Sequence, residues 1–114
     1  MNMLLKSRRL DDVVILALSG RITIGEGTVT VRDNLQKLLD GGDRKFLVNL
    51  ADVDYIDSSG LGELVIAFTT VRNHDGQLKL LHLTKRVHDL LQITKLLTVF
   101  ESFDSETEAI KSMK

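Results

Sequence analysis

The sequence predicts an α/β domain: a mixed sheet of four or five strands with about four helices packed on it. Two observations support this class. Short apolar runs typical of strands alternate with segments of helical periodicity. Its 114 residues, 43% of them hydrophobic, suffice for one core but not for two. We therefore expect a single domain over residues 1–114.

The N-terminal part is expected to begin with a hairpin. Strands over Met3–Arg9 and Val13–Ser19 are separated by a connection short enough only for an antiparallel pair. Val13–Leu18 is apolar at every position, which is typical of a strand covered on both faces, so this strand should be central. A helix is predicted over about Gly27–Asp40, because its leucines have helical spacing and Gly41-Gly42 can end it.

The rest of the chain is predicted to alternate strand and helix. Phe46–Leu50 indicates a second short apolar strand, and the acidic run Asp52–Asp54 indicates a turn. A strand–helix–strand unit of this size should be a right-handed parallel crossover. The later elements are a helix ending near Asn73, a strand over Gln77–Leu83, a helix capped by Thr84, a short strand at Val99-Phe100, and a helix opened by the capping box Ser105–Glu108.

The hexapeptide Asp57-Ser58-Ser59-Gly60-Leu61-Gly62 joins a strand to a helix. The first N–H groups of a helix lack internal partners and the helix dipole is positive there, so Ser58 and Ser59 suit either capping or phosphate. Loops that leave parallel strands meet at one sheet edge, so the motif should be exposed. Gly60 and Gly62 should permit close helix–strand packing. An apolar stripe should anchor the turn in the core: Leu61, Leu64, Val65 and Phe68.

Composition argues against several classes of partner. A net charge of −1 offers no broad attraction for nucleic acid or anionic lipid. The longest apolar run is far below the ~20 residues of a membrane helix, so no membrane partner is expected. Zero cysteines exclude disulfides and thiol chemistry and fit a reducing compartment, which makes the cytoplasm the expected location. No helix shows a second apolar face, so we expect a monomer in isolation.

Neither enzyme chemistry nor a bound metal is expected. A nucleophile elbow needs a glycine two residues before its serine, and Ile56 stands there before Ser58. Asp52 and Asp54 lack the further oxygen ligands of a calcium loop. The glycine patterns fit neither a dinucleotide fingerprint nor a phosphate loop, so no cofactor is assigned. The histidines form no pair at metal-ligand spacing; they are His74, His82 and His88.

The chain resembles the STAS-domain anti-sigma factor antagonists over nearly its whole length. The resemblance rests on the order of elements, on Gly20 at the close of the second strand, and above all on Asp57–Gly62, which has the family's Asp-Ser-Ser/Thr-Gly-Leu-Gly form. It implies that Ser58 is phosphorylated by a partner serine kinase that often is also the anti-sigma factor. The unphosphorylated protein would bind that factor and free a sigma factor, and the phosphorylated protein would let go until a phosphatase restores it.

One departure from the family pattern concerns the loop after the second strand. Many antagonists have an aspartate three residues after the glycine, and Thr23 stands there in this chain. This change, with Gly25–Gly27 as part of the same altered surface, suggests different partner contacts and either a different cognate kinase or a subfamily with its own pairing rules. Phosphorylation of Thr23 itself is a lesser possibility, and a STAS adaptor of a transporter or stress-signalling assembly is the alternative function. The partner-binding residues that the resemblance implies are Thr23, Asp57, Ser58, Ser59, Gly60, Leu61 and Gly62.

Overall fold

The computed structural model describes residues 3–23 and 26–114, and these residues form five strands and four helices. This arrangement confirms the predicted α/β class. The elements, in chain order, are β1 (Leu4–Leu10), β2 (Val13–Ile22), α1 (Glu26–Asp40), β3 (Lys45–Ile56), α2 (Ser58–Asn73), β4 (Gln77–Leu81), α3 (Lys85–Ile93), β5 (Ser102–Phe103) and α4 (Glu106–Ser112).

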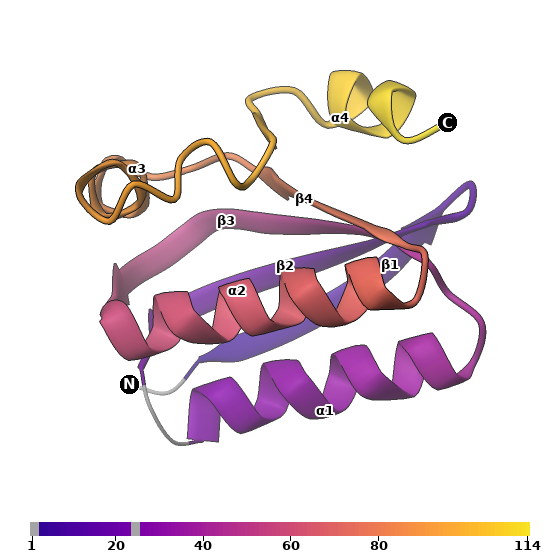
Figure 1. Ribbon diagram of the computed structural model, residues 1–114, viewed down its shortest axis with the longest axis horizontal. Helices are drawn as coiled ribbons and strands as arrows, with labels where there is room; N and C mark the ends of the chain where they lie inside the picture. The colour runs from indigo at the N-terminus through magenta and orange to yellow at the C-terminus, as the bar shows by residue number, and fades with distance from the viewer. Residues whose placement is uncertain (1–2, 24–25) are drawn as a thin grey trace.

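The strands lie in the sheet in the order β1-β2-β3-β4-β5 (Figure 1). β1 and β2 form the predicted antiparallel hairpin, with Leu10 opposite Val13, and every other neighbouring pair is parallel. β2 is therefore an inner strand, and its first four residues are buried on both faces, as the apolar run Val13–Leu18 predicts. Because β2 and β3 are parallel, their carboxyl ends reach the same edge of the sheet.

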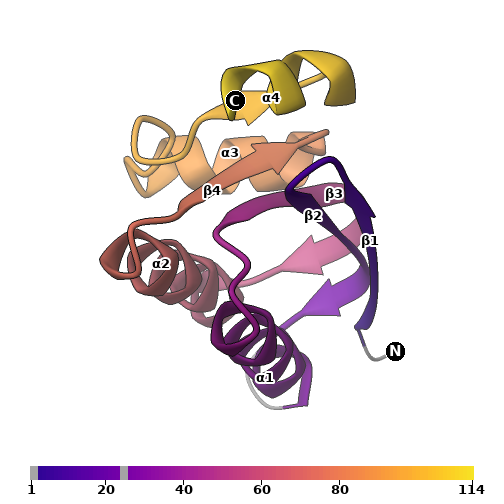
Figure 2. The same cartoon turned by 90° about the vertical axis from the view of Figure 1, so that its right-hand side faces the viewer.

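The helices cover the two faces of the sheet unequally (Figure 2). Helices α1 and α2 lie side by side against one face and enclose the main core, which includes Phe46 and Leu64. Helix α4 covers only part of the opposite face, where its apolar residues Ala109, Ile110 and Met113 pack with strand residues in a second cluster. Within residues 3–23 and 26–114, no helix is long and apolar enough to cross a membrane.

The caps predicted for the last two helices are confirmed. The Thr84 hydroxyl accepts a hydrogen bond from the Val87 N–H at 3.2 Å, and the Ser105 hydroxyl accepts one from the Glu108 N–H at 3.3 Å. Val87 also belongs to the main core, so α3 is fixed both by its cap and by packing.

The turn predicted at Asp52–Asp54 is wrong, because β3 continues through it to Ile56. Val53 is buried while the aspartates on either side of it are exposed. This alternation is that of a half-buried strand, whose successive side chains point to opposite faces. The extension carries β3 to the edge where the hexapeptide begins.

Other boundaries also differ from the prediction, and the strand predicted over Gln77–Leu83 ends at Leu81. Gly20 does not close the second strand: with φ 89° it lies at a register shift between β2 and β3, and the strand runs on to Ile22. Such a bulge bends a strand without ending it. Val99-Phe100 is not a strand, since the last strand is Ser102–Phe103, and Phe100 is buried in the main core.

Candidate functional site

Asp57 is the N-cap of α2, in an extended backbone conformation with φ −106° and ψ −179°. Its side-chain oxygen accepts a hydrogen bond from the Gly60 N–H at 2.8 Å, and its carbonyl accepts one from the Leu61 N–H at 2.9 Å. The capping role considered for Ser58 and Ser59 is therefore wrong, because a carboxylate fills it. The two serines are instead the first two residues of the helix, and both are exposed as predicted.

The start of α2 lies very close to the end of β2. A Cβ atom on Gly60 would stand 2.0 Å from the Ile22 carbonyl oxygen, so only glycine fits there. The Asp57 N–H points to the same oxygen at 3.4 Å. The close packing predicted for Gly60 is confirmed, whereas a Cβ on Gly62 would meet nothing within 4 Å, so the prediction is wrong for Gly62.

Thr23 lies beside the hexapeptide. Ile22 is the register partner of Ile56 in the parallel pair β2–β3, so the next residue of each strand, Thr23 and Asp57, emerges at the same edge. Thr23 is partly exposed. The structure thus brings together all the residues implied as partner-binding. The change predicted at Gly25–Gly27 lies outside the residues whose side chains are described.

Leu61 anchors the turn in the core, as the helical stripe predicts. It is 2% exposed, and Leu64 one turn later has the same value. Val65 and Phe68 are only partly buried and pack against the main core. Each exposed serine is therefore carried on a turn that the sheet and the core hold in place.

A buried carboxylate lies on the same helix, one turn after the serines. Both Glu63 oxygens accept hydrogen bonds from Arg32 of α1, from Nε at 2.8 Å and from Nη2 at 3.0 Å. The Glu63 side chain is 9% exposed, whereas that of Arg32 is 58% exposed. This two-point hydrogen bonding with Glu63 raises the pKa of Arg32 and ties α1 to α2 beside the motif.

A cluster of two arginines and a tyrosine stands at the same sheet edge. The guanidinium carbon of Arg21, from β2, lies 4.4 Å from the Tyr55 ring centroid, and that of Arg86, from α3, lies 4.9 Å from it. Arg21 is also the register partner of Tyr55. Sequence reasoning missed this cluster because its members are far apart in the chain. One available signal was that Tyr55 is the single tyrosine and directly precedes the Ile56 that ends β3.

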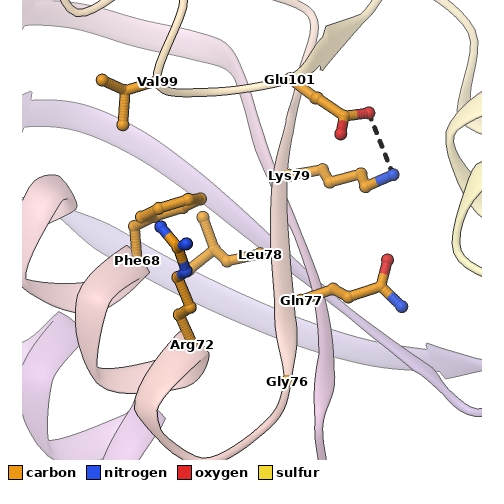
Figure 3. A pocket seen from close by; sticks show the side chains of 8 residues that line it. All are labelled: Phe68, Arg72, Gly76, Gln77, Leu78, Lys79, Val99 and Glu101. Carbon is orange, nitrogen blue, oxygen red and sulfur yellow. Dashed lines mark ion pairs between the residues drawn. The ribbon is translucent and has the colours of Figure 1, made fainter.

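A separate hollow of about 220 Å³ lies at the other end of α2 (Figure 3). Phe68 and Arg72 line it from the helix, and Lys79 and Glu101 form an ion pair of 3.1 Å at its rim. A helix rises 1.5 Å per residue, so Phe68 is ~15 Å along the axis from Ser58. This hollow is not part of the hexapeptide site. In the part of the chain that the structure describes, no group of three metal-ligating side chains could hold an ion.

Comparison with known proteins gives consistent results. The family model for the STAS domain matches residues 5–109. The anti-sigma-B factor antagonist of Bacillus subtilis is 31% identical over 101 residues, which span 89% of this chain and 91% of that protein.

Solved structures share the fold over nearly the whole chain. The crystal structure of a candidate anti-sigma factor antagonist from Thermotoga maritima is 26% identical, with a TM-score of 0.87 over 96% of this chain and 93% of that one. The phosphorylated form of the Bacillus cell fate determinant SpoIIAA is 18% identical. It shares the fold with a TM-score of 0.75, over 97% of this chain and the whole of that one.

Proposed function

The chain belongs to the STAS-domain family of anti-sigma factor antagonists, and we propose that it works as a phosphorylation-controlled binding protein. Unphosphorylated, it binds an anti-sigma factor and so frees a sigma factor for transcription. Phosphorylation of Ser58 by a serine kinase, which can be the anti-sigma factor itself, breaks the complex, and a serine phosphatase restores it. The protein acts by binding, carries out no catalysis, and works in the cytoplasm, where sigma factors meet RNA polymerase.

The exposed Ser58 hydroxyl is the observation that supports this proposal. Asp57 already caps the helix, and within residues 3–23 and 26–114 the Ser58 side chain makes no hydrogen bond. The hydroxyl is thus open to a kinase without any loss of structure. The first N–H groups of a helix have no intrahelical acceptor, so a phosphate on Ser58 would find donors and a positive helix end close by.

The same phosphate would disfavour a partner packed on this edge. A phosphoserine adds about −1.5 to −2 charges at pH 7, next to the Asp57 carboxylate. Burying it under a partner would cost desolvation, whereas at the free helix end it stays in water. A thousandfold loss of affinity requires only ~4 kcal/mol. SpoIIAA, which shares the fold, has been solved in a phosphorylated form, and this supports a domain whose fold persists on phosphorylation.

Phosphorylation by an anti-sigma-factor serine kinase from the same organism tests the proposal. The wild-type protein is incubated with that kinase and ATP, and intact mass and peptide mapping locate the phosphate. We expect one phosphate that maps to Ser58 and is absent from Ser58→Ala. In Ser59→Ala and Thr23→Ala the phosphate should still map to Ser58, whatever its rate of incorporation, which excludes these two hydroxyls as the acceptor. No phosphorylation by any such kinase, and partner binding that Ser58→Asp leaves unchanged, would instead favour the adaptor of a transporter or stress-signalling assembly without a sigma-factor role.

A further inference from the structure

The cluster of Arg21, Tyr55 and Arg86 holds two positive charges against one aromatic ring. Both guanidinium carbons lie within 4.9 Å of the Tyr55 centroid, so they are at most 9.3 Å apart, the sum of 4.4 and 4.9 Å. That separation is about one Debye length at physiological salt, so the two charges act on a nearby anion together. Contact with the ring restrains both side chains without neutralising either charge.

Neither arginine of this cluster has an anionic partner among the described residues, although carboxylates satisfy other arginines of the chain. Arg8 pairs with Glu106, Arg9 with Asp43, and Arg32 with Glu63. Arg21 and Arg86 are both exposed, and Tyr55 is partly exposed. Two desolvated, unpaired like charges would be costly in an interface, so a partner that covers them must supply negative charge.

An apolar groove of about 520 Å³ adjoins the cluster and shares Arg86 with it. Its apolar lining is Ile56, Leu90 and Ile93, and Ile93 is 78% exposed, more than any other large apolar residue described. The remaining charges in the groove, Lys85 and Asp89, neutralise each other at 2.8 Å. Arginine, tyrosine and exposed apolar side chains in one patch have the composition of a protein-binding hot spot.

The groove is continuous with the candidate switch. Ile56 lines it and immediately precedes Asp57, the cap of α2. Helix α3 and the first turn of α2 lie at the same end of the molecule (Figure 1). A single partner surface seated over Ser58 would therefore extend onto the groove and the arginine cluster.

We propose that the anti-sigma factor docks here with an acidic and apolar segment: carboxylate side chains pair with Arg21 and Arg86, and an apolar side chain fills the groove beside Ile93. The inference rests on the proposed function and deepens it by naming the chemistry of the partner's surface. The arginines supply electrostatic steering and register, and the groove supplies apolar burial.

Affinity measurements at two salt concentrations test the charged half of this inference. Arg21→Gln/Arg86→Gln is titrated calorimetrically against an anti-sigma factor from the same organism, with Arg72→Gln as the control. Arg72 is exposed, lies in the last turn of α2 and has no carboxylate partner in the described residues. We expect the double variant to bind about tenfold more weakly at low salt, with the difference shrinking at high salt, while the control binds like wild type.

Ile93→Ser tests the apolar half and should weaken binding equally at both salt concentrations, whereas Val99→Ser, an exposed apolar control, should not.

Arg86→Lys tests whether the partner presents a carboxylate, because carbodiimide joins an amine to a carboxylate. Peptide mapping should find residue 86 linked to an aspartate or glutamate of the anti-sigma factor, with no such link at residue 72 in Arg72→Lys.

The outcomes separate this inference from the proposed function. Wild-type binding that Ser58→Asp abolishes but Arg21→Gln/Arg86→Gln and Ile93→Ser leave unchanged would overturn the docking site alone. A dimer of the free protein that Arg86→Gln dissociates would assign the surface to a second copy and overturn the partner proposed here. No binding of the wild type to the anti-sigma factor would contradict the proposed function, and the docking site with it.

Discussion

Replacing Gly60 with alanine should destabilise the domain even though alanine is the better helix former. At a solvent-exposed position inside a helix, replacing glycine with alanine stabilises the folded state by ~1 kcal/mol, because glycine loses more backbone entropy on folding. At Gly60 the new Cβ would stand 2.0 Å from the Ile22 carbonyl oxygen and 2.8 Å from its carbonyl carbon. Cβ atoms essentially never come within 3.0 Å of such an atom, so strand and helix must separate by about 1 Å.

The contacts between the end of β2 and the start of α2 leave little room for such a separation. The Asp57 N–H is already 3.4 Å from the same oxygen, and Leu61, next to the substituted residue, is fully packed. Overpacking of a filled site costs ~1–3 kcal/mol, and more where backbone atoms collide. After subtraction of the gain in propensity, we expect Gly60→Ala to lose ~2 kcal/mol of unfolding free energy.

Gly62→Ala is the matched control, two residues along the same helix. Its Cβ would meet nothing within 4 Å, so only the propensity gain applies and the variant should be ~0.5–1 kcal/mol more stable than wild type. Urea denaturation followed by circular dichroism measures both variants. A Gly60→Ala variant as stable as wild type would contradict the predicted clash with Ile22, and so would a change of stability in the same direction for both variants.

Three further predictions concern the cap, the anchor and an ion pair. Asp57→Ala should lower the unfolding free energy by ~1 kcal/mol in urea titration, and Asp57→Asn should not, since asparagine caps as well; equal losses in both would contradict the capping role. Leu61→Ala should cost ~2–5 kcal/mol by the same titration, and a loss below 1 kcal/mol would mean that Leu61 is no anchor. A hydrogen bond from Lys45 holds the pKa of Asp12 below its ordinary value of 3.8. The wild-type protein should therefore be more stable than Asp12→Asn above pH 3.8, and this difference in stability should disappear as the pH falls below 3.8. Thermal melts of both proteins across this pH range measure the difference. A difference that grows at low pH would contradict the lowered pKa of Asp12.

Much of the fold could be predicted because its signals are local. The hairpin follows from a three-residue connection, the central strand from its unbroken apolar run, and the last two helices from Thr84 and Ser105. The error at Asp52–Asp54 arose because charged residues favour turns, while the buried Val53 between them carried the weaker signal of alternation. The prediction of a strand at Val99-Phe100 is wrong because an aromatic residue that packs into the core from a turn has no distinctive local pattern.

The site could be predicted only in part. The hexapeptide can be recognised from its sequence. Which of its residues caps the helix depends on backbone angles, so the sequence does not distinguish Asp57 from the serines as the N-cap. The burial of Glu63 and the meeting of Arg21 with Arg86 depend on contacts between distant segments. Single-residue patterns carry no information on such contacts, since helix and strand periodicity report only which face a residue occupies.

The proposed switch, in which phosphorylation of Ser58 releases the anti-sigma factor, is best tested by measuring binding. The dissociation constant for the anti-sigma factor is determined for the unphosphorylated protein and for the protein phosphorylated at Ser58. Circular dichroism of both forms controls for the fold, which should be unchanged. Phosphorylation should weaken binding about a thousandfold, equivalent to ~4 kcal/mol. Equal dissociation constants for the two forms, with phosphate verified on Ser58, would contradict the proposed switch.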